Sequence, residues 1–199
     1  CSTTTVWEGF FKEANYAESC PASSIIHMKF PRKDGKGDIK FTWMDGGLIP
    51  ERPEELLPDE PMGDWNGGYI FVGTKGKLMG GYNLEPKLLP TSQMADALPP
   101  KTIPRIPDGA AGHYTQWVEA CIQGYGKVEL SSPFEYAGPF TEAVLMGNLA
   151  LRSYMMRGTD NRSYPGRKKL LWDAQNMKIT NFDDANAFVK RTYREGWNY

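Results

Sequence analysis

The chain has 199 residues, enough for one large domain or two small ones to bury a core without the help of a metal or a disulfide. Its 23 basic and 24 acidic side chains nearly cancel and form no long run of either sign, which argues against nucleic acid and anionic lipid surfaces as partners. No apolar run reaches the ~20 residues that span a bilayer, and the cysteines and histidines lack metal-ligand spacing, so we expect no membrane span and no metal site.

The two ends and the cysteines leave the compartment open. The sequence begins at Cys1 without a methionine or a signal sequence, so we expect it to be a piece of a longer polypeptide, cytoplasmic or periplasmic. Three cysteines fit no disulfide framework. Cys121 lies on the apolar face of an expected helix, which predicts an inert, buried thiol.

The first 80 residues have the patterns of strands. Residues 3–7 are β-branched and aromatic, and residues 24–30 and 38–44 alternate, with Ile39, Phe41 and Trp43 on one face. The turn formers PRKDGKG between the last two strands predict a hairpin.

Two irregular stretches flank a second expected hairpin. Residues 45–68 carry four prolines and a cluster of acids, and loops of this length inside a domain are often functional. The hairpin follows in GYIFVGTKGKLMGGY, where residues 69–72 should pair with residues 77–79. Residues 83–108 are rich in proline, which predicts an extended strap across the surface.

Helical periodicity dominates the second half. Residues 113–123 form an expected helix whose apolar face holds Tyr114, Trp117, Val118, Cys121 and Ile122. A second helix should start at Pro139, and because it is apolar nearly all round we expect it to lie inside the protein. Short strands at residues 169–173 and 177–180 and a last helix from Asp183 complete an α+β domain with a largely antiparallel sheet.

The small residues of the central helix predict a close contact. Ala143, Gly147 and Ala150 fall at helical spacing on one side. A glycine inside a helix costs ~1 kcal/mol relative to alanine, so its presence indicates that another part of the backbone passes close there.

The sequence has no self-contained catalytic motif: no G-x-G-x-x-G after a strand, no P-loop, no G-x-S-x-G and no H-E-x-x-H. The remaining candidates are aromatic and short polar side chains in loops and at element ends. Aromatic faces beside carboxylates and amides suit sugar-like substrates, although any one tryptophan can instead belong to the core. We predict substrate contacts at Trp43, Asp45, Trp65, Tyr82, Arg105 and His113.

His113 is the strongest of these candidates. At the start of its helix, on the border of the apolar face, its ring could turn towards a cleft and exchange a hydrogen bond with a hydroxyl group. The alternative is that it caps its own helix or bonds a carbonyl group in the proline strap.

A series of motifs in a fixed order covers nearly the whole chain from about Ser23. The motifs are FTWMDGGLIPERPEEL, GGYIFVGTKGKLMGG, LLP with PPKTIPRIP, GHYTQWVEACIQG, SPFEYAGPFTEAVLMGNLALR, KKLLWDAQNMKITN and ANAFVKRTYREGW. This order resembles the C-terminal domain of Gfo/Idh/MocA-type oxidoreductases, most closely the branch found in Bacteroides-like bacteria.

The resemblance implies an open-faced, mainly antiparallel sheet with helices packed on one face, forming a single domain over residues 1–199. In the family this domain contacts the sugar-like substrate and builds a dimer or tetramer, while an N-terminal Rossmann domain of the same polypeptide binds NAD or NADP. The nucleotide-binding glycines and the E-K-P lysine belong to that absent domain, so we expect no cofactor site and no catalytic residue in this chain. The family's aspartate and histidine four residues apart are also missing, and residues 1–22 match the family poorly.

Three functions remain open. The first is the substrate-binding and oligomerisation domain of an NAD(P)-dependent oxidoreductase acting on a sugar or sugar-like alcohol. The second keeps the fold in an NAD-dependent glycosidase or lyase, and the third is a sugar-binding or scaffold domain with no enzymatic role. In each case we expect self-association through one sheet built from the stretches around Ile25, residues 39–43 and residues 69–72.

Overall fold

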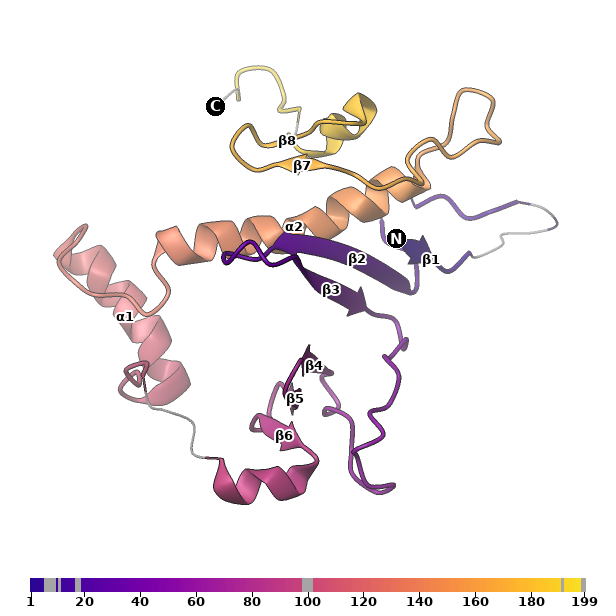
Figure 1. The fold of residues 1–199 in the computed structure, drawn as a ribbon. Coiled ribbons are helices and arrows are strands. Elements are labelled where there is room, and N and C mark those ends of the chain that lie inside the picture. The colour runs from indigo at the N-terminus through magenta and orange to yellow at the C-terminus, as the bar shows by residue number, and fades with distance from the viewer. Residues whose placement is uncertain (6–9, 11, 17–18, 98–101, 191, 198–199) are drawn as a thin grey trace. The chain divides into compact units, whose positions relative to one another are not determined.

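The computed structural model describes residues 1–5, 10, 12–16, 19–97, 102–190 and 192–197, and the chain divides into two compact units (Figure 1). The first unit comprises Cys1–Ile49 and Ser132–Tyr199, and the second comprises Pro50–Ser131. Three small antiparallel sheets and a few helices give the expected α+β class.

The first unit contains the first sheet, which has the order β1-β2-β3. Its strands are β1 (Ser2–Thr3), β2 (Ser24–Pro31) and β3 (Asp38–Met44), all antiparallel. The predicted β2–β3 hairpin is confirmed. The strand expected at residues 3–7 is shorter in the part that the structure describes, and Val6 and Trp7 lie outside the described residues.

The register of the hairpin gathers its apolar side chains on one face. Ile26 pairs with Trp43, Met28 with Phe41, and Phe30 with Ile39, and directly opposed residues share a face. His27 and Thr42 form a hydrogen-bonded pair on the opposite face, where Lys29 also opposes Lys40. The sheet therefore has one apolar and one polar face.

The long helix α2 (Phe134–Met155) packs on the apolar face, against β1 and β2. A β-carbon at Gly147 would lie 3.6 Å from Cδ1 of Ile26, which is an ordinary side-chain contact. The prediction that another part of the backbone passes close to Gly147 is therefore wrong for the described residues. No packing of α2 on β3 is found among the described residues. Phe41 and Trp43 therefore stay 42% and 53% exposed.

Two further expectations for α2 are wrong. The helix begins at Phe134, so Pro139 lies inside it, because the amides of Tyr136 and Ala137 already bond the carbonyl oxygen of Pro133 and start the helix earlier. The helix is also not buried all round: Phe140, Val144 and Leu145 are more than half exposed, since nothing in the described part of the chain covers that side.

The second half of α2 is covered by the C-terminal segment. This segment forms β7 (Trp172–Asp173), β8 (Lys178–Ile179) and a 3₁₀ helix η2 (Asp183–Phe188), so the expected strands and the expected last helix are all shorter than predicted. Their core is a cluster of Ile179, Phe182 and Ala185, packed against Leu149 of α2.

Gly166 permits this segment to lie close to the helix. A β-carbon at Gly166 would meet the backbone oxygen of Ser153 at 1.9 Å, far inside contact distance. Ser153 is fully buried there.

The second unit holds the second sheet, β4-β5-β6. Its strands are β4 (Gly68–Gly73), β5 (Gly76–Gly81) and β6 (Lys87–Leu89), and the predicted β4–β5 hairpin is confirmed. Leu56, Met79 and Leu89 form its core. The expectation that residues 69–72 share a sheet with β2 and β3 is wrong, because β4 is the edge strand of a separate sheet and pairs with β5, its neighbour along the chain.

The same unit contains a short 3₁₀ helix η1 (Thr91–Asp96) and the helix α1 (Gly109–Gln123). The predicted α1 exists but begins four residues before His113. Its apolar face is not buried: Tyr114, Trp117 and Ile122 are more than 60% exposed. Cys121 is exposed as well, so the prediction of a buried thiol is wrong.

Candidate functional site

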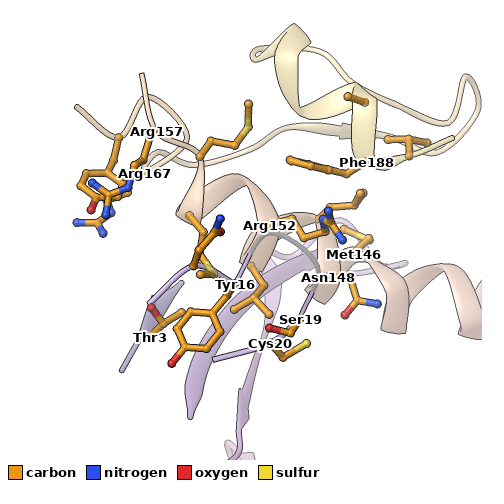
Figure 2. A pocket seen from close by; sticks show the side chains of 18 of the residues that line it. Thr3, Tyr16, Ser19, Cys20, Met146, Asn148, Arg152, Arg157, Arg167 and Phe188 are labelled. Carbon is orange, nitrogen blue, oxygen red and sulfur yellow. The ribbon is translucent and has the colours of Figure 1, made fainter. Parts of the chain in front are cut away.

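A cavity of about 1360 Å³ lies in the first unit, beside the second half of α2. Its wall comes from three parts of the chain: residues 3–5 with 12–20 where described, α2 with the loop that follows it, and the η2 region (Figure 2). Its labelled lining side chains are Thr3, Tyr16, Ser19, Cys20, Met146, Asn148, Arg152, Arg157, Arg167 and Phe188.

An ion pair joins two distant parts of the chain at one end of this cavity. Arg157 donates to the Glu13 carboxylate, and its other terminal amino group donates to the backbone oxygen of Asn161 at 3.2 Å. The Tyr164 hydroxyl donates to the same carboxylate at 2.8 Å. Because this bond favours the protonated phenol, it raises the pKa of Tyr164 above its ordinary value.

Arg167 lies between two tyrosine rings at the same end. Its guanidinium carbon is 3.5 Å from the centre of the Tyr164 ring and 4.4 Å from that of Tyr154. Its Nε donates to the backbone oxygen of Tyr154 at 3.4 Å. The Arg157 guanidinium carbon also lies 5.1 Å from the centre of the Tyr164 ring, so two cations share one ring. Figure 2 shows Arg157 and Arg167 together at this end of the cavity.

The remaining charged groups on the wall leave an excess of positive charge. Arg152 lies 4.9 Å from the ring centre of Phe188, and Lys12 and Lys190 also line the cavity. Among the described residues of the wall, the acids beside these five basic groups are Glu13 and Glu142, and Glu142 accepts a 2.7 Å hydrogen bond from the neutral Trp172 indole. The wall is therefore suited to attract an anion.

None of the six residues predicted to contact substrate lines this cavity. In the first unit the structure brings Trp43 and Asp45 together: the Trp43 indole donates to Asp45 at 3.0 Å. The Asp45 carboxylate also accepts from the Ser24 amide at 2.6 Å and the Ser24 hydroxyl at 2.9 Å. Asp45 thus fixes the end of the hairpin and holds a half-exposed tryptophan in place.

Trp65 and Tyr82 lie in two loops of the second unit that Asp64 ties together. The Asp64 carboxylate accepts from the amide of Asn83 at 2.6 Å and from that of Asn66 at 2.8 Å. Trp65 is 88% exposed and Tyr82 is 83% exposed, so neither belongs to the core.

His113 and Arg105 are also exposed in the second unit. His113 lies in the second turn of α1, so the expectation that it opens the helix is wrong; Asp108 and Gly109, both with positive φ, let the helix start earlier. Its Nδ1 is 3.3 Å from the Ser131 hydroxyl. Arg105 makes no hydrogen bond or ion pair with the described residues.

The arginine and tyrosine cluster is not among the residues predicted from the sequence. The run YMMRGTDNRSYPGRKK, residues 154–169, alternates aromatic and basic residues with a single acid, and this pattern could have marked it. Glu13 carried no such signal, because it meets Arg157 across 144 positions of the chain.

No family model matches the chain, and the search of the curated proteins found no relative. Within the described ranges, no three His, Cys, Asp or Glu side chains come together in a way that could hold a metal ion. Nor is any helix in the described part of the chain long and apolar enough to cross a membrane.

Proposed function

We propose that this chain is the substrate-binding and oligomerisation domain of an NAD(P)-dependent oxidoreductase that acts on a sugar or a sugar-like alcohol. The observation that carries this proposal is the order of the seven sequence motifs. Several coincide with structural units: FTWMDGG covers the end of β3 and the turn held by Asp45, SPFEYAGPFTEAVLMGNLALR covers most of α2, and KKLLWDAQNMKITN covers the β7–β8 hairpin.

The exposed aromatic side chains support a role in sugar binding. Trp43 presents a half-exposed ring whose orientation is set by Asp45, while Trp65 and Tyr82 extend from loops whose backbones Asp64 fixes. A fixed aromatic face, such as that of Trp43, suits stacking on the C–H face of a sugar, because little side-chain freedom is lost on binding. The NAD or NADP would be bound by an N-terminal Rossmann domain of the same polypeptide.

The apolar face of the first sheet supports a role in oligomerisation. Ile39 and Phe41 lie on the same face as Ile26 but outside the cover of α2. A symmetric dimer or tetramer would bury them.

The first test is the reading frame upstream of Cys1, followed by an assay of the full-length protein. We expect a glycine-rich nucleotide-binding motif upstream and a change in nicotinamide absorbance with a panel of sugars and cyclitols. Release of free sugar without net change in the redox state of the nicotinamide would instead indicate the glycosidase. A reading frame with no nucleotide-binding domain would overturn the enzymatic proposal and favour the scaffold.

His113 provides a test within the chain. In the full-length enzyme, His113→Ala should lower kcat/KM at least tenfold, about 1.4 kcal/mol of transition-state binding, with little change in Tm. Ser131→Ala is the control, because it removes the hydrogen-bond partner and leaves the imidazole in place. If both variants lose the same stability and keep their activity per folded molecule, His113 has a structural role and its assignment to the substrate must be withdrawn.

A further inference from the structure

We propose that the cavity of the first unit binds a small molecule through an anionic group, a carboxylate or a phosphate, that Arg167 receives. This site is separate from the proposed sugar contacts, since none of those six residues lines the cavity. It also needs no residue of a nucleotide-binding domain, so it can be tested on this chain by itself.

The charges at the Arg167 end of the cavity are not balanced among the described residues. The Glu13 carboxylate meets the charge of Arg157 directly. Arg167 has no carboxylate partner among the described residues: its contacts are two tyrosine rings and one backbone oxygen, through Nε. In the part of the chain that the structure describes, one acid therefore stands against two arginines that lie over the same ring, and an arriving anion would restore the balance.

The geometry leaves the binding end of Arg167 available. Its Nε is occupied, whereas its two terminal amino groups meet no acceptor in the described part of the chain. These groups form the planar fork that binds a carboxylate or phosphate through two parallel hydrogen bonds. The Tyr154 and Tyr164 rings hold the fork, so less side-chain entropy is lost when a ligand binds.

The rest of the cavity fits an acidic ligand of sugar size. Its volume of about 1360 Å³ is more than a monosaccharide needs, and its wall mixes apolar groups such as Leu149 and Met156 with the amides of Asn148 and Asn161. Arg152 and Lys190 add positive potential further along the wall. An acidic sugar, either a uronic acid or a sugar phosphate, meets all these features.

Isothermal titration of the purified chain with four probes tests the proposal. The probes are inorganic phosphate, glucuronate, glucose 6-phosphate and glucose. We expect saturable binding of glucuronate or glucose 6-phosphate with a Kd below about 1 mM, and no binding of glucose at that concentration. Whichever of the two binds more tightly shows whether the site prefers a carboxylate or a phosphate. Binding of phosphate alone means a phosphate site that does not recognise sugar and overturns the ligand class.

Substitutions then locate the site. Arg167→Gln should weaken binding of the preferred acid at least tenfold, and Arg167→Lys, which keeps the charge but lacks the fork, should give a smaller loss. Arg162→Gln is the matched control: it removes an exposed arginine of the same loop that does not line the cavity, and it should leave the Kd unchanged. An equal loss of affinity in the Arg162 and Arg167 variants would show that Arg167 is not the binding residue and would overturn the proposal.

A variant that should bind the acid more tightly keeps the proposal testable if the Arg167 variants do not fold. Glu13→Gln keeps a hydrogen-bond acceptor for Arg157 and Tyr164 but removes the competing negative charge, so the preferred acid should bind at least threefold more tightly. Unchanged or weaker binding in a folded Glu13→Gln protein, or equal binding of glucose and the acids by the wild type, would overturn the proposal.

Discussion

The two halves of α2 have similar composition and opposite surroundings. In the first half Phe140 is 60% exposed and Val144 is 58% exposed, whereas in the second half Leu151 is 6% exposed and Ser153 is fully buried. The second half packs on β1 and β2 and is covered by the C-terminal segment with its Ile179 and Phe182 cluster. Apolar composition therefore identifies surface that needs a partner, and only the neighbouring elements decide whether that partner lies within the unit.

The largest contrast should come from removing one apolar side chain in each half. Leu151→Ala should lower the free energy of unfolding by about 3 kcal/mol, because it opens a cavity where the surroundings cannot fully collapse. Val144→Ala should change it by no more than about 0.5 kcal/mol in dilute solution. Urea denaturation followed by circular dichroism measures both values.

The Val144 variant also tests whether the first half is an interface. If an oligomer covers it, the loss for Val144→Ala will grow with protein concentration, because association stabilises the folded state by mass action. If Leu151→Ala and Val144→Ala lower the free energy of unfolding equally at low protein concentration, the two halves of α2 do not differ in burial.

A second contrast places the same substitution near each half. Gly166→Ala should destabilise the protein by about 2 kcal/mol, since the new β-carbon would collide with the backbone of Ser153 and the segment must shift. Gly138→Ala, in the exposed half, should change stability by no more than about 0.5 kcal/mol, because the better helix propensity of alanine is offset by crowding against the following Pro139. Apart from its chain neighbours, its β-carbon would meet the ring of Phe134 at 3.3 Å, and that ring is 82% exposed and can move. Thermal unfolding measures the change in stability of both variants. A Gly166→Ala protein as stable as the wild type would show that Gly166 does not lie close to the backbone of Ser153.

The local elements were predictable because their signals are local. Alternation along β2 and β3 with turn formers between them predicts the first hairpin, and the Gly-bounded turn between β4 and β5 predicts the second. The stripe of Ala143, Gly147 and Ala150 predicted a close backbone approach that the structure does not show, because Gly147 meets the Ile26 side chain at ordinary contact distance. The α+β class followed from the order of these elements.

Burial and the cavity depend on long-range packing, which the sequence alone did not reveal. The exposed faces of α1 and of the first half of α2 have the same periodicity as buried ones, so Cys121 and Phe140 were predicted to be inside. The Glu13, Arg157 and Tyr164 cluster joins residues more than 140 positions apart, and no local pattern encodes that meeting. Family membership and the six predicted substrate contacts stay predictions.

The smallest expected effect concerns the loop that leads from α2 back to Gly166. The Asp160 carboxylate accepts hydrogen bonds from the amides of Ser163 and Arg162 and from the Ser163 hydroxyl, which lowers the pKa of Asp160 from its ordinary 3.8 to about 2. A depressed folded-state pKa contributes stability above the ordinary pKa, and this contribution is lost as the pH falls towards 2.

Asp160→Asn should therefore lower the Tm slightly at neutral pH and have progressively less effect as the pH is lowered from 4 to 2. Carboxyl chemical shifts measured by NMR should titrate Asp160 near 2 in the wild type. A titration midpoint near 4 would show that the loop does not hold the carboxylate in this way.

The exposed Cys20 and Cys121 have a practical consequence. One belongs to each compact unit, and both are open to reagents, so a Cys1→Ser protein could carry one fluorophore on each unit without any added cysteine. Energy transfer between the two labels would report changes in the separation of the units when a ligand binds. Cys20 also lines the cavity, so a polarity-sensitive dye attached there would respond directly to the arrival of an acidic ligand.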